Sequence, residues 1–333
     1  MKPIDQWLLN LGSEATKRQY LHWFKRFCVF TKSTPEKLVL KARQDIAKNT
    51  SEVDTLTKRF RDYLLKEGYT EGSCQTAMFA VRSLFTWNNV RQPKLGRPFS
   101  VRFQPAFEAR RVLCKEELHK MIENTESELQ SLVLKFIPQS GQRRGIVSAL
   151  RFSHIKENIL PLPELDKVGP LLFRIPPIIK DKYGFNTNKT RNSYRFGLSD
   201  LLAREIVEHL KKRELAGENL DKDSWLFAEI GGKPLYGDKI RTFVNRAAER
   251  AGLQTWIESK KRGKMASIHA HVFRDYFKRE LRASGAIAKN PRLDSEVFLD
   301  MCLGHVDSYG GAYSRISDEE ILQVFKDAGP FLA

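Results

Sequence analysis

Apolar residues recur at steps of three and four positions through the first 90 residues of the chain. Such spacing places them on one face of an amphipathic helix. Helices are predicted over 16–30, 53–66 and 73–88, with Gly68 ending the second as its C′ residue. The apolar stripe of the first helix is Tyr20, Trp23, Phe24, Phe27 and Phe30, and that of the third is Met78, Val81, Leu84 and Phe85. We assign these aromatic residues to a hydrophobic core rather than to base stacking, and expect a helical domain over 1–92.

The pattern breaks at 93–110, where prolines and a glycine stand among basic residues and resist regular structure. We expect a basic linker here, followed by a second domain over 111–333. The second domain mixes helical and strand patterns, so the predicted fold class is mainly α, of the α+β type. Its predicted helices begin near Lys115 and cover 132–138, 200–214, 238–251, 271–284 and 294–302, and its predicted strands cover 171–179 and 193–198.

The stretch 316–325, near the last residue of the sequence, has an amphipathic pattern, and two interpretations stay open for it. The segment 316–333 docks on a neighbouring protomer, or it packs on its own domain.

Charge narrows the class of partner. The chain has 57 Lys and Arg against 40 Asp and Glu, a net charge of +17 and a pI of about 9.7. Such a surplus favours a polyanion, because basic side chains release the counterions condensed on a nucleic acid. Residues 1–105 hold 19 of the basic and 9 of the acidic residues, so the helical segment is the more basic per residue. Candidate DNA-binding residues are Lys17, Arg18, Lys25, Arg26, Arg91, Lys94 and Arg97.

Cysteine content and hydropathy indicate an intracellular location. The four cysteines are far apart and form no CxxC pair, which argues against a zinc site or a disulfide framework. The first residues lack the apolar run of a signal peptide, and no stretch approaches the roughly 18 apolar residues that span a bilayer. We expect a cytoplasmic, nucleoid-associated protein without a membrane partner.

Four short segments, far apart in sequence, combine residues suited to phosphate chemistry. They are Ser140-Gly141-Gln142-Arg143, His271-Val272-Phe273-Arg274, Leu303-Gly304-His305 and Ala312-Tyr313-Ser314-Arg315. Each alone is a weak signal, because such short patterns arise often by chance. Their order, ending in a tyrosine close to the last residue, makes the combination specific. It closely resembles the motif set of the tyrosine recombinase (phage-integrase) family, and the resemblance covers the whole chain.

The resemblance implies a site-specific DNA recombinase, such as an archaeal or mobile-element integrase. Tyr313 would attack the scissile phosphate to form a covalent 3′-phosphotyrosine, assisted by Arg143, His271, Arg274 and His305. The implied architecture is a helical core-binding (SAM-like) domain beside a mixed catalytic domain with a small antiparallel sheet, together a C-shaped clamp on double-stranded DNA. Four protomers would assemble on two DNA sites. No cofactor, metal or ATP is implied.

The chemistry of these residue types agrees with the assignment. Attack on a phosphodiester builds negative charge on the non-bridging oxygens, which two guanidiniums can clamp bidentately. Imidazoles can donate hydrogen bonds or assist proton transfer near neutral pH. A phenol, with an ordinary pKa of about 10, is a poor nucleophile until a positive field or a base helps to ionise it.

Two assignments keep alternatives. In the resembled family a lysine on a β-hairpin protonates the leaving 5′-oxygen; Lys189 matches it best, and Lys180 and Lys182 stay open. The nucleophile Tyr313 has a rival in Tyr309, which stands closer to the histidine of the Leu-Gly-His segment.

The sequence departs from the family at one position. Three residues after the first arginine the family often has an acidic residue that orients it, and here that position is Ile146. Arg143 therefore needs another orienting partner, or Arg144 shares its role. A catalytically silent DNA-binding protein of the same fold is the alternative function, and a relaxing topoisomerase is a further one within the enzyme class.

Overall fold

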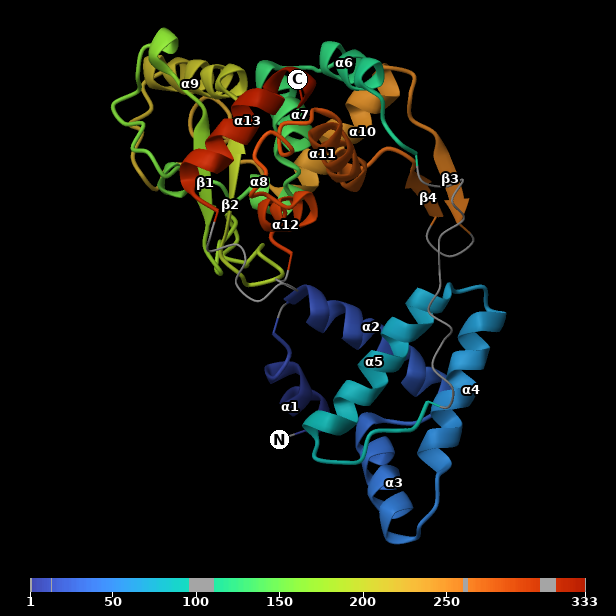
Figure 1. Cartoon of the computed structure of the whole chain (residues 1–333). Coiled ribbons are helices and arrows are strands. Elements are labelled where there is room, and N and C mark those ends of the chain that lie inside the picture. Colours follow the sequence, from blue (N-terminus) through green and yellow to red (C-terminus); the bar gives the residue numbers. More distant parts are fainter. Residues whose placement is uncertain (1, 13, 96–110, 260–262, 306–315, 333) are drawn as a thin grey trace. The chain divides into compact units, whose positions relative to one another are not determined.

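The computed structural model describes residues 2–12, 14–95, 111–259, 263–305 and 316–332. Contacts between Cα atoms divide the chain into two units, which Figure 1 shows. The first comprises Met1–Phe107 and Glu258–Lys264, and the second comprises Glu108–Ile257 and Met265–Ala333. Across the described residues, every helix is too short or too polar to cross a membrane. Each unit has its own hydrophobic core and is described by itself.

The first unit is a set of helices whose ends follow from local sequence. Its helices are α1 (Pro3–Leu9), α2 (Glu14–Thr31), α3 (Pro35–Ala47), α4 (Glu52–Lys66) and α5 (Glu71–Trp87). Thr34 and Thr70 cap α3 and α5 by accepting backbone hydrogen bonds. Gly68 follows α4 with a φ of +83°, as a C′ glycine should. The three predicted helices are confirmed as α2, α4 and α5, whereas α1 and α3 were not predicted as separate helices.

Aromatic rings fill the core of this unit. The rings of Trp7 and Phe24 lie 5.4 Å apart, and those of Phe27 and Phe60 lie 5.2 Å apart. The predicted stripe of α2 faces inward, with Trp23, Phe24 and Phe27 buried and Tyr20 and Phe30 half-buried. The four apolar positions predicted for α5 are fully buried. The assignment of the aromatic residues to a core is confirmed for these positions.

The second unit is mainly helical, with a small antiparallel sheet, and confirms the predicted fold class. Its helices are α6 (Lys115–Glu123), α7 (Glu128–Ser140), α8 (Arg144–Val147), η2 (Phe152–His154), η3 (Leu165–Lys167), α9 (Asp200–Leu215), α10 (Gly237–Arg250), α11 (Ala270–Ala283), α12 (Ser295–Cys302) and α13 (Asp318–Leu332). The predicted helices in this part correspond to α6, α7 and α9 to α12.

The sheet pairs β1 (Leu171–Ile175) with β2 (Tyr194–Leu198), in a register that sets Leu171 opposite Leu198. β1 stops at Ile175, before the end predicted at 179, because two prolines follow and neither has an N–H for the ladder. The rings of Phe173 and Phe196 stack 4.8 Å apart on the face that meets Phe136 of α7. A second pair of strands, β3 (Trp256–Ser259) and β4 (Gly263–Ala266), was not predicted.

The last helix, α13, packs against α11 and β2 of its own unit (Figure 1). Its Phe325 ring lies 6.2 Å from that of Phe277, and a Cβ at Gly197 would come within 2.7 Å of it. At its first turn, Asp318 is ion-paired with Lys156, Arg174 and Arg195 of the same unit. In the single chain, α13 therefore packs on its own domain, which is one of the two predicted arrangements. Docking on a neighbouring protomer stays a prediction.

Candidate active site

The turn that carries Arg143 requires a glycine. α7 ends at Ser140, and Gly141 closes it in the left-handed region with a φ of +65°. A Cβ at Gly141 would lie 2.5 Å from Phe277 and 2.7 Å from Leu303, so a larger residue would push the chain away from both. The turn thereby places Arg143 at the N-cap of α8.

Arg143 is half-buried, and within the described residues its guanidinium has neither a carboxylate nor a hydrogen-bond partner. Ile146, where the family often has an acidic residue, is buried in the core. Arg144 turns to the start of α10 instead, where it pairs with Asp238 at 3.0 Å and donates to the carbonyl of Gly237. Among the described residues, none occupies the five N–H donors of the Arg143 guanidinium.

Arg274 joins three of the four predicted segments. It lies in the first half of α11 with 7% of its surface exposed. Its Nη1 donates to the carbonyl of Gly141 at 2.8 Å, and its Nη2 donates to the carbonyl of Leu303 at 2.6 Å. Nη2 also lies 3.0 Å from Nε2 of His305. Burial and the neighbouring Arg143 lower the pKa of Arg274 to about 10, so it remains cationic at neutral pH.

The two carbonyls that hold Arg274 belong to the C-caps of two helices. Gly141 is the C-cap of α7, and Leu303 is the C-cap of α12. The carbonyl end of a helix carries a partial negative charge, and the last carbonyls have no partner within the helix. Two helix ends therefore stabilise a buried guanidinium, which has no direct carboxylate partner in the described part of the chain.

The Leu-Gly-His segment is the end of α12 in a Schellman motif. Gly304 has a φ of +62° and donates to the carbonyl of Met301, while His305 donates its backbone N–H to the carbonyl of Asp300 at 3.0 Å. A Cβ at Gly304 would lie 2.6 Å from the ring of Tyr194. The glycine is therefore required twice, by its backbone angle and by the ring beneath it.

The side chain of His305 is held at both nitrogens. Nδ1 lies 2.7 Å from Oδ1 of Asp300, and Nε2 faces Arg274. Burial lowers the pKa of His305, and although Asp300 opposes the shift the net direction is downward. Asp300 was not singled out in the sequence. The Schellman pattern could have indicated it, because the residue after the C′ glycine returns to the third residue from the end of the helix.

His271 lies in the first turn of α11 and is exposed. Its ring is 6.0 Å from that of His269, the N-cap residue. Partial burial, followed by the positive charges of His269, Arg274, Arg143 and Lys189, lowers the pKa of His271. Arg274, Arg143 and Lys189 come from three separate segments, so the fold concentrates positive charge around this imidazole.

The three candidate lysines lie in the connection between β1 and β2 and differ in their surroundings. Lys189 is exposed and close enough to His271 to influence its pKa. It follows the buried Asn188, whose amide donates to the carbonyls of Pro176 and Asn192 and fixes this part of the loop. The ammonium of Lys182 instead sits 4.2 Å from the ring centroid of Tyr236. Lys180 is exposed, in an isolated bridge with Asn186.

The predicted nucleophile Tyr313 and its rival Tyr309 lie outside the described residues, as does Arg97. Of the predicted catalytic residues that the structure does describe, Arg143, Arg274, His271 and His305 lie together, with Lys189 nearby.

The candidate DNA-binding residues of the first unit differ in how they are paired. Lys17 pairs with Glu14 at 2.7 Å, and Arg91 pairs with Asp54 at 3.2 Å. Arg26 lies over the ring of Tyr69, 5.1 Å from its centroid, and the backbone N–H of Lys94 bonds to Asp54. Arg18 and Lys25 are exposed and, within the described part of the chain, have no carboxylate partner.

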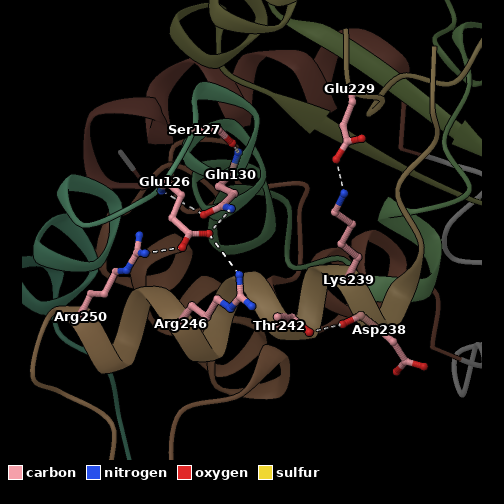
Figure 2. Close-up of polar contacts among 9 residues, drawn as sticks. All are labelled: Glu126, Ser127, Gln130, Glu229, Asp238, Lys239, Thr242, Arg246 and Arg250. Carbon is pink, nitrogen blue, oxygen red and sulfur yellow. Dashed lines mark hydrogen bonds and ion pairs between the residues drawn. The ribbon is translucent and has the colours of Figure 1, made fainter. Parts of the chain in front are cut away.

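The basic residues of α10 are largely neutralised by carboxylates from other elements, as Figure 2 shows. Arg246 and Arg250 both reach Glu126, which also accepts from the amide of Gln130. Lys239 pairs with Glu229. The unneutralised positive charge of the second unit therefore depends more on residues such as Arg143 and Lys189 than on the three paired residues of α10.

No protein-family model matches the sequence, and neither does any curated protein. Solved structures do match. The Tn1549 transposon integrase in complex with transposon right end DNA aligns with a TM-score of 0.53 and 11% identity, over 92% of each chain. A lambda integrase dimer bound to a COC′ core site aligns with a TM-score of 0.51 and 15% identity, over 96% of this chain and 90% of that one. The chain therefore has the tyrosine recombinase fold.

Proposed function

We propose that the protein is a site-specific DNA recombinase or integrase that cleaves and rejoins DNA strands through a 3′-phosphotyrosine at Tyr313. The observation that carries the proposal is the position of Arg274. It hydrogen-bonds to the turn before Arg143 and to the end of α12, and it lies beside His305. Three segments thus meet at one guanidinium, although Gly141 and Leu303 stand 133 and 29 residues from Arg274 in the sequence. Structural neighbours that are integrases bound to DNA support the same class of activity.

Arg143 and Arg274 would bind the non-bridging oxygens of the scissile phosphate. Arg143 has no partner among the described residues, and Arg274 is held by carbonyls that leave its charge intact. Negative charge grows on those oxygens as the phosphorus becomes five-coordinate, so fixed cations stabilise the transition state more than the substrate. The phosphotyrosine conserves the energy of the broken ester, so rejoining would need no ATP.

Lys189 is the residue we propose to protonate the leaving 5′-oxygen, with His271 as a hydrogen-bond donor to the phosphate. Lys189 is exposed and contributes to the field at His271, whereas the ammonium of Lys182 is held against Tyr236. A protonated amine that reaches the leaving oxygen can act as a general acid.

The helical segment 1–92 would serve as the core-binding domain and would close a clamp on duplex DNA with the catalytic domain at 111–333. Among the candidates predicted from the sequence, Arg18 and Lys25 are the ones we propose as phosphate contacts, because they are exposed and not neutralised within the described residues. Assembly of four protomers on two sites, in the cytoplasm with the nucleoid, belongs to the same proposal.

A trapping experiment tests the proposal. A binding site is first selected from random duplexes by the protein itself. The site is then nicked close to the cleavage position, so that cleavage releases a short fragment with a free 5′-hydroxyl. This fragment diffuses away and cannot reverse the reaction. The wild-type chain should accumulate a covalent complex on a denaturing gel. Tyr313→Phe should abolish it while DNA affinity stays within about twofold, and Tyr309→Phe should retain it. Complex that persists in Tyr313→Phe would move the nucleophile, and no complex in the wild type would favour the silent DNA-binding protein.

A further inference from the structure

The contacts of Arg274 determine the protonation of His305. A guanidinium has only N–H donors, so the Nε2 atom that faces it at 3.0 Å must accept. An imidazole that accepts at Nε2 is neutral and carries its proton on Nδ1. That proton points to Oδ1 of Asp300 at 2.7 Å, a carboxylate that can only accept when ionised. Carboxylate, imidazole and guanidinium therefore form one directed chain of hydrogen bonds.

We infer that Asp300 is a positioning residue of the active site, which acts on Arg274 through the neutral, Nδ1-protonated form of His305. The role rests on the proposed function, since Arg274 is there the phosphate-binding group. A carboxylate that fixes a histidine tautomer through its Nδ1–H is a general device for orienting the opposite nitrogen.

The arrangement keeps the orienting carboxylate out of direct contact with Arg274. A carboxylate in direct contact with a phosphate-binding guanidinium would offset part of the charge that the phosphate needs. Here the carboxylate enters from α12 and is separated from Arg274 by an imidazole, so it orients the guanidinium at a greater distance from its charge.

A consequence concerns His305 itself. Its single N–H is given to Asp300 and its lone pair to Arg274, so in this state it has no donor for a phosphate oxygen. Donation to the phosphate then belongs to His271, and His305 supports Arg274. Among the residues that the structure describes, the charged groups that face His305 are Asp300 on α12 and Arg274 and Lys278 on α11. Protonation of Nε2 would set two donors against each other and break the contact with Arg274.

The first test reads the tautomer without any reaction. The chain has seven histidines, so ring nitrogen NMR of uniformly labelled protein can be assigned by the loss of signals in His305→Ala. At pH 7 the wild type should show His305 with a protonated Nδ1 and an unprotonated Nε2. Asp300→Asn should populate the other tautomer in part, because an amide can also donate to Nδ1, and in that form Nε2 loses its contact with Arg274. A wild-type spectrum with the proton on Nε2 would overturn the inference.

The second test reads the trapping rate. Asp300→Asn should slow covalent trapping by about tenfold to a hundredfold, as replacement of residues that orient a reacting group commonly does. Glu296→Gln is the matched control, since Glu296 lies on α12 but pairs with Arg282, and it should keep the wild-type rate. In a His305→Ala background, Asp300→Asn should have no further effect.

The outcomes separate the two proposals. If Asp300→Asn slowed covalent trapping by the same factor in the presence and in the absence of His305, the positioning role would be overturned and the recombinase proposal would stand. Absence of trapping by the wild type would refute the recombinase proposal. The His305 tautomer measured by NMR would then still test the hydrogen bonds that join Asp300, His305 and Arg274. Should Asp300→Asn fail to fold, the wild-type spectrum still supports or overturns it.

Discussion

Asp318 joins the last helix to the sheet, and its replacement by asparagine should destabilise the second unit. The carboxylate has 10% of its side-chain surface exposed and pairs with Lys156 at 2.7 Å, Arg174 at 2.7 Å and Arg195 at 2.5 Å. Burial alone would raise the pKa of Asp318, but the three cations outweigh it and hold the pKa far below its usual range. It also lies in the first turn of α13, where a negative charge is favourable.

The magnitude follows from the exposure of the partners. Removing one partner of a fully buried ion pair costs about 3–5 kcal/mol. The side chains of Lys156 and Arg174 are 33% and 55% exposed, so water compensates part of the loss. We therefore expect Asp318→Asn to lower the free energy of unfolding by about 2–3 kcal/mol at pH 7. Asp327→Asn, which removes the surface pair with Lys289, should cost less than about 1 kcal/mol.

The destabilisation by Asp318→Asn should depend on pH in a definite direction. A carboxyl whose folded pKa is depressed stabilises the protein above its unfolded pKa, near 3.9, and loses that contribution as the pH falls toward the folded value. The difference between wild type and Asp318→Asn in urea unfolding should therefore be smaller at pH 3 than at pH 7. A difference that is the same at both pH values, or no larger than that of Asp327→Asn, would refute the reasoning.

Three further outcomes are expected. Gly304→Ala should lower the unfolding free energy by more than about 2 kcal/mol and abolish trapping, because a φ of +62° and the ring of Tyr194 both exclude a side chain; trapping at the wild-type rate would contradict this. Lys189→Ala should slow trapping on a normal substrate but not on one with sulfur at the leaving 5′ position, which needs no proton, and Lys182→Ala should show no such rescue. Arg18→Ala should reduce the slope of log K against log salt by about one, measured by fluorescence anisotropy; an unchanged slope would exclude a phosphate contact.

Much of the first unit could be predicted because its helices carry a complete local signal. The stripe of Trp23, Phe24 and Phe27 has helical spacing, and each of these residues is buried. The end of α4 was predicted equally well, since Gly68 adopts the φ of +83° after it without the strain that a side chain would bring. α3 has a weaker pattern, in which charged residues interrupt the apolar positions, and its start depends on a threonine cap that was not recognised.

The candidate site could be predicted only as far as its motifs reach. Arg143, Arg274 and His305 are visible as residues, but their meeting depends on two helix ends and on close packing of Gly141 against Phe277 and Leu303. Periodicity reports which face of a helix is buried, and it carries no information about which carbonyl a side chain will reach. β3 and β4 were missed for a related reason, because strands of four residues are too short to show an alternating pattern.

Two glycines do more for this site than permit its turns. Gly141 and Gly304 end α7 and α12, and the carbonyls of Gly141 and Leu303 at those ends both receive Arg274. A buried guanidinium normally needs a carboxylate, and a carboxylate would offset the charge that a phosphate is to bind. Helix ends supply only partial charges, and Asp300 acts from beyond an imidazole, so Arg274 is buried, oriented and still positive.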